Sequence, residues 1–146
     1  MTVKVIYHSS KSGNTAKLAG AIAEELCVKA ERIDKNISFP EPVDILFVGD
    51  GIYWAKPHRT TREFFKKLDP ALIRNAAVFA TYGNQFKIGD DLRKLLQGKG
   101  INVVIEPFIC KGASIGTKNQ GHPDETDLQN VRVFAQNAVA ALEKCL

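Results

Sequence analysis

Short apolar runs alternate with amphipathic stretches along this chain, and that alternation constrains the fold more than any other feature. Residues 43–49 and 76–82 are almost continuously apolar, which is typical of strands covered on both faces of a parallel sheet. Residues 3–8, 29–34 and 101–110 are the other expected strands. Five strands alternating with helices predict an α/β fold, a doubly wound five-stranded parallel sheet with helices on both faces.

The stretches between the runs carry apolar side chains at helical spacing. Leu18, Ile22 and Leu26 lie four residues apart and therefore share one face of an expected helix. The expected helices cover residues 15–26, 59–68, 88–97 and about 122–142. The length of 146 residues suits one domain of about 150 residues, so residues 1–146 are expected to form a single unit.

Composition and cysteine usage narrow the class of protein. With 45% hydrophobic and 25% charged residues, the chain can build a core, and disorder is excluded. No apolar run approaches the roughly 18 residues of a membrane span, and a net charge of +4 does not by itself indicate nucleic acid. Cys27, Cys110 and Cys145 show neither a CxxC pair nor zinc-ligand spacing. With an apolar run directly after Met1, we expect a cytoplasmic protein with reduced thiols and no metal.

The loop after the first expected strand is rich in hydroxyl groups and leads directly into a helix. It reads Ser9-Ser10-Lys11-Ser12-Gly13-Asn14-Thr15. Glycine permits a tight turn, and the amides and dipole of a helix start attract anions. Because the hydroxyls of Ser10, Ser12 and Thr15 can donate to the same anion, the loop predicts a phosphate site. The alternative is a serine-rich turn that only caps the helix.

The loop expected after the third strand carries two adjacent aromatic residues. Tyr53 and Trp54 lie outside both periodic patterns, and Trp54 is the only tryptophan. Ligands of parallel sheets lie beyond the carboxyl ends of the strands, where an aromatic ring suits a flat π-system. The alternative is that both rings fill a gap under a helix.

Three loops together resemble the FMN-binding loops of flavodoxins and flavodoxin-like proteins. Ser10-Lys11-Ser12-Gly13-Asn14-Thr15 resembles the loop that holds the FMN phosphate in that family. Thr81-Tyr82-Gly83-Asn84-Gln85-Phe86 resembles the loop beside the isoalloxazine ring, although Asn84 stands where many flavodoxins have an aromatic residue. The connection from Cys110 to His122 is short, as in short-chain flavodoxins. The resemblance implies the strand order 2-1-3-4-5.

The resemblance also implies which residues bind FMN. They are Ser10, Lys11, Ser12, Gly13, Asn14 and Thr15 in the first loop, Gly51, Ile52, Tyr53, Trp54, Ala55 and Lys56 in the second, and Thr81, Tyr82, Gly83, Asn84 and Phe86 in the third. No residue is expected to be catalytic if the protein is an electron carrier.

The implied function is low-potential electron transfer between redox partner proteins. The alternative is a small FMN-dependent oxidoreductase, a quinone reductase or a protoporphyrinogen-oxidase-like enzyme. Residues 51–58 resemble the Gly-Ile-Tyr-x-x-Lys-x-His run of the latter, which makes His58 either a proton donor or an ordinary loop histidine. A two-component receiver domain is excluded, because His8-Ser9-Ser10 occupies the place of its Mg²⁺-binding acids. A module that has lost its flavin is disfavoured by the intact first loop.

Basic residues are concentrated in one segment after the second loop. Residues 56–74 hold six basic and two acidic residues, an excess as large as the net charge of the whole chain, +4. The segment from Lys56 to Arg74 is therefore a candidate docking surface for an acidic redox partner, or a site for an anionic substrate. The alternative is a solvated helix face. We expect a monomer.

Overall fold

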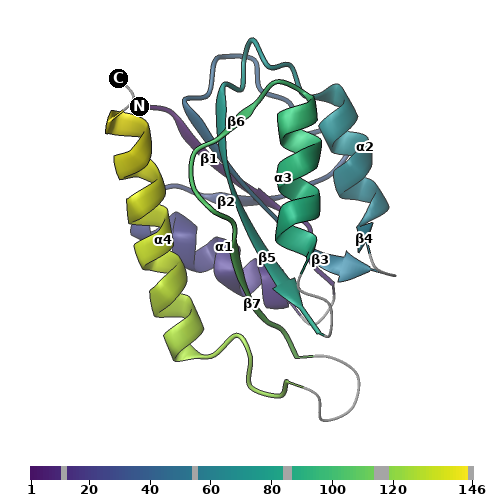
Figure 1. The fold of residues 1–146 in the computed structure, drawn as a ribbon, viewed down its shortest axis with the longest axis vertical. Helices are drawn as coiled ribbons and strands as arrows, with labels where there is room; N and C mark the ends of the chain where they lie inside the picture. Colours follow the sequence, from purple (N-terminus) through teal and green to yellow (C-terminus); the bar gives the residue numbers. More distant parts are fainter. Residues whose placement is uncertain (11–12, 54–55, 84–86, 114–118, 145–146) are drawn as a thin grey trace.

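A twisted sheet separates two helical layers in the computed structural model of the chain (Figure 1). The structure describes residues 1–10, 13–53, 56–83, 87–113 and 119–144, with the backbone alone at 52 and 53. The helices are α1 (Asn14–Glu25), α2 (Arg59–Lys67), α3 (Ile88–Gly98) and α4 (Glu125–Lys144). The strands are β1 (Val3–Tyr7), β2 (Ala30–Arg32), β3 (Ile45–Tyr53), β4 (Lys56–Pro57), β5 (Asn75–Tyr82), β6 (Asn102–Val103) and β7 (Phe108–Lys111).

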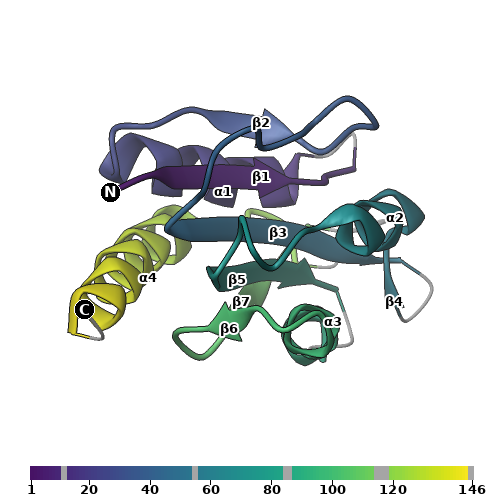
Figure 2. The same ribbon diagram turned by 90° about the horizontal axis from the view of Figure 1, so that it is seen from above.

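The sheet has the predicted order. Its strands run β2-β1-β3-β5-β6, with β7 also paired to β5, as Figure 2 shows from above. All these pairs are parallel. Since β6 and β7 together occupy the place of the fifth expected strand, the predicted order 2-1-3-4-5 is confirmed.

Two details differ from the sequence-based expectation. The fifth strand is split, because β6 pairs with the start of β5 and β7 with its end. Pro107, which cannot donate to a ladder, lies in the interruption. The third strand continues past residue 49 to Tyr53 and turns back as the antiparallel β4. Between β2 and β3, residues 33–44 cross over without a helix, and none was expected there.

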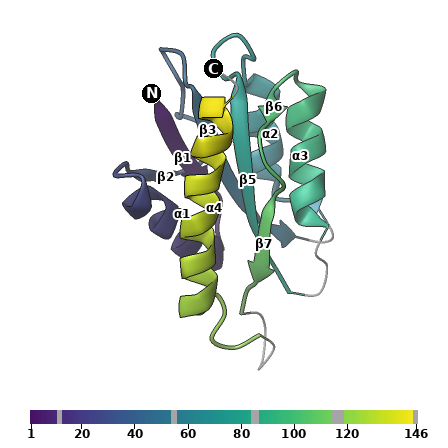
Figure 3. The ribbon, with the colours of Figure 1, turned by 60° about the vertical axis from the view of Figure 1, so that its left-hand side comes forward.

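Two apolar clusters hold the layers together. One lies between the sheet and the pair α1 and α4, and it includes Leu18, Ile22 and Phe134. The other lies under α2 and α3 and includes Phe64, Leu92 and the crossover residue Ile33. Figure 3 shows α1 and α4 together on one side and α3 with α2 on the other. The apolar side chains that the sequence places at helical spacing, such as Leu18 and Ile22, therefore pack in the core as predicted.

The chain termini lie at the end of the sheet where the parallel strands begin (Figure 1). The carboxyl ends of β1, β3, β5 and β7 point the opposite way, toward the loops of the expected FMN site. No helix among the described residues is long and apolar enough to cross a membrane.

Gly49 of β3 lies directly against the ring of Phe79 in β5. A Cβ added at Gly49 would approach Phe79 Cε2 to 2.1 Å, and Phe79 is fully buried. The two strands can hold this register only with glycine at position 49.

We therefore expect Gly49→Ala to lower the free energy of unfolding by about 3 kcal/mol or more, because the buried ring has no room to retreat. The matched control is Gly20→Ala in α1, where a Cβ meets no atom within 4 Å. That change should raise stability by roughly 0.5–1 kcal/mol. Urea denaturation of both variants measures the difference. Equal stability of the two variants would contradict the packing at Gly49.

Candidate functional site

The first loop presents helix amides that donate to no acceptor among the described residues. Gly13 precedes α1 with φ 75°, a left-handed conformation suited to glycine, and its amide donates to Ser10 O at 3.0 Å. Among the described residues, the amides of Asn14 and Thr15 have no hydrogen-bond acceptor. A Cβ placed on Gly13 would meet no atom within 4 Å, so the space beside the loop is open. This combination can receive an anion.

The helix cap differs from the simple serine cap considered as the alternative. Gly13 occupies the cap position and offers no side chain. Ser9 Oγ instead accepts from the amide of Ala16 at 3.3 Å. Ser10 is exposed, and Lys11 and Ser12 lie outside the described residues.

Side chains of α1 tie the first loop to its neighbours along the carboxyl edge of the sheet. The hydroxyls of Thr15 and Thr81 are 2.9 Å apart and buried, which joins the first loop to the end of β5. Asn14 Nδ2 donates to Ala113 O at 2.7 Å, just after β7. The contact with Ala113 was not predicted, although its place after the fifth strand indicates the same edge. The expected site residues Asn14, Thr15 and Thr81 therefore lie together.

The second and third expected loops are described in part. Gly51 lies within β3, opposite Thr81, and Lys56 is exposed on β4. Tyr82 ends β5 and is half-buried, and Gly83 O accepts from Asn119 Nδ2 at 3.0 Å. Trp54, Ala55, Asn84 and Phe86 lie outside the described residues, as do the side chains of Ile52 and Tyr53.

A buried carboxylate near these loops organises two histidines. Asp50 is fully buried in β3, and its oxygens accept from the amides of Gly51 at 2.8 Å and His58 at 2.9 Å. His8 Nδ1 lies 3.3 Å from Asp50 Oδ1. The rings of His8 and His58 stack with centroids 3.8 Å apart and an interplanar angle of 11°. Sequence reasoning missed this cluster, although Asp50 lies in β3, the neighbour of the strand β1 that ends just before His8.

His58 also begins α2. Its Nδ1 accepts from the amide of Thr60 at 3.0 Å and therefore carries no proton in this arrangement. Burial, and next the adjacent His8 ring, lower the pKa of His58 below its usual 6.5. The structure thus gives this expected loop histidine a definite role as a helix cap.

Comparison with known proteins gives one clear relative. No protein-family model matches the chain. "Uncharacterized protein MJ0298" of Methanocaldococcus jannaschii is 32% identical over 148 residues, which cover 94% of this chain and 97% of the relative. The chain belongs to the same family as MJ0298.

Solved structures decide the fold. A flavodoxin from the domain Archaea superposes with a TM-score of 0.79 at 17% identity, over 98% of this chain and 99% of that one. A WrbA-like flavodoxin from Agrobacterium tumefaciens superposes with a TM-score of 0.74 at 16% identity, over 98% of both chains. This is the flavodoxin-like fold, and the resemblance found in the three loops is confirmed at that level. The near-complete mutual coverage agrees with the short-chain form.

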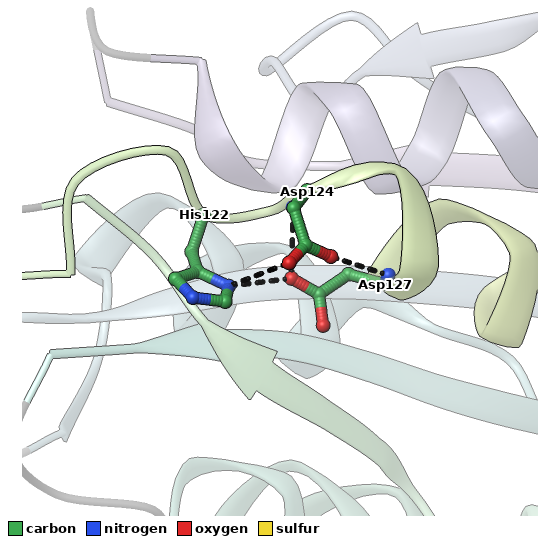
Figure 4. A group of neighbouring side chains, drawn as sticks. All are labelled: His122, Asp124 and Asp127. Atoms are coloured by element: carbon green, nitrogen blue, oxygen red, sulfur yellow. Dashed lines mark hydrogen bonds and ion pairs between the residues drawn. The ribbon is translucent and has the colours of Figure 1, made fainter.

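A second polar cluster of this flavodoxin-like chain lies at the start of α4 (Figure 4). Ligand atoms of His122, Asp124 and Asp127 all lie within 4.8 Å of one another. The two carboxylates, however, cap the helix reciprocally: Asp127 accepts from the amide of Asp124, and Asp124 from that of Asp127, at 2.8 and 2.9 Å. Burial of Asp127 opposes its ionisation, but the hydrogen bond from His122 at 2.8 Å and that from the Asp124 amide lower its pKa overall. These contacts explain why the three side chains lie together: they cap the start of α4.

The lowered pKa of His58 predicts a pH dependence of folding. As pH falls, His58 takes up a proton in the unfolded chain before it does so in the folded protein. The contribution of neutral His58 to the free energy of unfolding is therefore fully present above about pH 6.5 and is lost as pH falls through the pKa of His58 in the folded protein. Asparagine can still accept from the Thr60 amide but does not titrate. We expect the unfolding free energy of the wild type to fall more steeply between about pH 7 and pH 5 than that of His58→Asn. Urea denaturation at each pH measures this, and parallel curves would refute it.

Proposed function

We propose that this protein binds one FMN without a covalent bond and carries electrons at low potential between redox partner proteins. The observation that carries the proposal is the pair of amides at Asn14 and Thr15, which donate to none of the described residues and lie beside open space at the start of α1. A dianionic phosphate suits such a place, because the helix dipole and the amides act on it together. The start of α1 lies at the carboxyl edge of the sheet, which is where ligands bind in parallel sheets of this kind.

In this proposal each of the three loops contacts a different part of FMN. Residues 10–15 hold the phosphate through amides and hydroxyls. Thr81 keeps Thr15 in position, and Gly51 and Gly83 allow the backbone to come close to a flat ring. Tyr53 and Trp54 line the ring, and one of them stacks on it. FMN, once bound, supplies the capacity to accept and release electrons.

We further propose that basic residues of α2 meet an acidic redox partner. The helix and its flanks carry Lys56, Arg59, Arg62, Lys66 and Lys67, most of them exposed, and the first turn of α2 holds no acidic residue. Opposite charge on a partner steers encounter and sets orientation.

A second candidate is a small FMN-dependent oxidoreductase. The stacked pair of His8 and His58, one ring of which is held by Asp50, favours it, because oriented imidazoles can move protons. The WrbA-like structure shares the fold with this chain. Stepwise reductive titration of the FMN-loaded protein separates the candidates. Two resolved one-electron steps support the carrier, whereas a single two-electron step supports the oxidoreductase.

The phosphate assignment predicts a preference for FMN over riboflavin. Since charge-assisted hydrogen bonds contribute about 1.5–3 kcal/mol each, riboflavin should bind at least about a hundredfold more weakly. Ser10→Asp should weaken FMN binding by repulsion and leave riboflavin binding unchanged. Ser38→Asp, a surface change on the crossover, is the matched control. Flavin fluorescence titration of the wild type and both variants measures all six affinities, and equal affinity of the wild type for the two flavins would contradict the proposal.

The stacking assignment predicts a fluorescence change. Trp54 is the only tryptophan, so its emission reports on the second loop alone. Adding FMN to flavin-free protein should quench that emission strongly, and Trp54→Phe should remove the signal while FMN still binds. If the emission of Trp54 stays unchanged while FMN binds, Trp54 does not stack on the ring.

A further inference from the structure

A cavity of about 490 Å³ lies between α2 and the helix-free crossover from β2 to β3, beside the end of β1. Its volume is within the range of small-molecule sites. Ile33, Ile37 and Phe64 give it an apolar wall, and the ring of His8 forms part of the lining. Among the described residues, none of those expected to bind FMN lines it.

Positive charge around the cavity exceeds negative charge. Four basic side chains line it, namely Arg32, Lys35, Arg59 and Lys67. Among the described residues, the cationic groups of Lys35, Arg59 and Lys67 have no hydrogen-bond or ion-pair partner. Arg32 is held in place, since its Nη1 donates to Ser9 O at 2.7 Å.

Neither acidic residue of the lining forms an ion pair with the cations of Lys35, Arg59 or Lys67. Asp34 Oδ1 accepts from the amides of Asn36 and Ile37, at 2.7 and 3.1 Å. Glu63 pairs with Lys66, outside the cavity, at 3.4 Å. The cavity is therefore left with cations that no carboxylate of its own wall approaches.

His8 adds a fixed polar group to the wall. Its Nδ1 lies against the buried Asp50, and its ring stacks on His58, so two separate contacts set its orientation. The ring of His8 is therefore a fixed part of the cavity wall.

We propose that this cavity binds a small organic anion, a molecule with an apolar body and a carboxylate. The apolar wall of Ile33, Ile37 and Phe64 takes the body, and Lys35, Arg59 and Lys67 take the charge. The proposal rests on these lining residues and not on FMN binding, since none of the described residues expected to bind FMN lines the cavity.

The test uses 2-naphthoate as the probe, titrated into protein saturated with FMN so that the flavin site is filled. The chain has three histidines, whose ring signals can be followed by ¹H–¹³C NMR. We expect the ring signals of His8 and His58 to shift, and those of His122, at the start of α4, to stay in place. The neutral analogue 2-naphthalenemethanol should bind at least tenfold more weakly.

A pair of charge variants tests the location. Arg59→Gln should weaken 2-naphthoate binding at least fivefold, whereas Arg74→Gln, which removes the same charge from an exposed residue outside the cavity, should leave it unchanged. Both side chains are exposed, and thermal unfolding verifies that both variants fold. Equal affinity of the two variants, equal binding of the neutral analogue, or a shift of His122 as large as that of His8 would each overturn the proposal. The FMN and riboflavin affinities test the flavin site separately.

Discussion

The carboxylate of Asp50 is buried within β3, and the arrangement of the carboxyl edge of the sheet depends on the hydrogen bonds that this carboxylate accepts. A buried carboxylate is costly unless donors surround it. Here the donors come from the His8 ring, the Gly51 amide and the His58 amide. One group thus fixes the end of β1, the continuation of β3 and the start of α2 relative to one another. Both the proposed flavin site and the proposed anion cavity border this junction.

Small residues and hydroxyls complete the junction on the side of α1. Gly49 lets Phe79 lie against β3, and the buried hydroxyl pair of Thr15 and Thr81 links the first helix to β5. Close backbone approach and short polar contacts leave little freedom in the spacing of the loops. Such a preset edge suits a rigid cofactor, because the protein loses little entropy when the cofactor binds.

Much of the fold could be predicted from the sequence, because the signals are local. The apolar runs of β3 and β5 and the helical spacing of Leu18, Ile22 and Leu26 follow from burial, and three loops in the right order indicated the family fold. The extension of β3 to Tyr53 was missed, since Gly49-Asp50-Gly51 has low strand propensity and is held by its pairing with β5. The split of the fifth strand was also missed. The stacking of His8 on His58 could not be predicted, because it joins residues fifty positions apart through a buried acid.

The position of the two termini has a practical consequence. Both lie where the parallel strands begin, whereas every loop proposed to hold a ligand follows a strand's carboxyl end (Figure 1). An affinity tag, a fluorescent protein or an electron-donating domain joined to either end would therefore lie away from the loops that are proposed to hold a ligand. Another module could thus be joined covalently to the chain, and a freely diffusing molecule could still reach the carboxyl edge of the sheet.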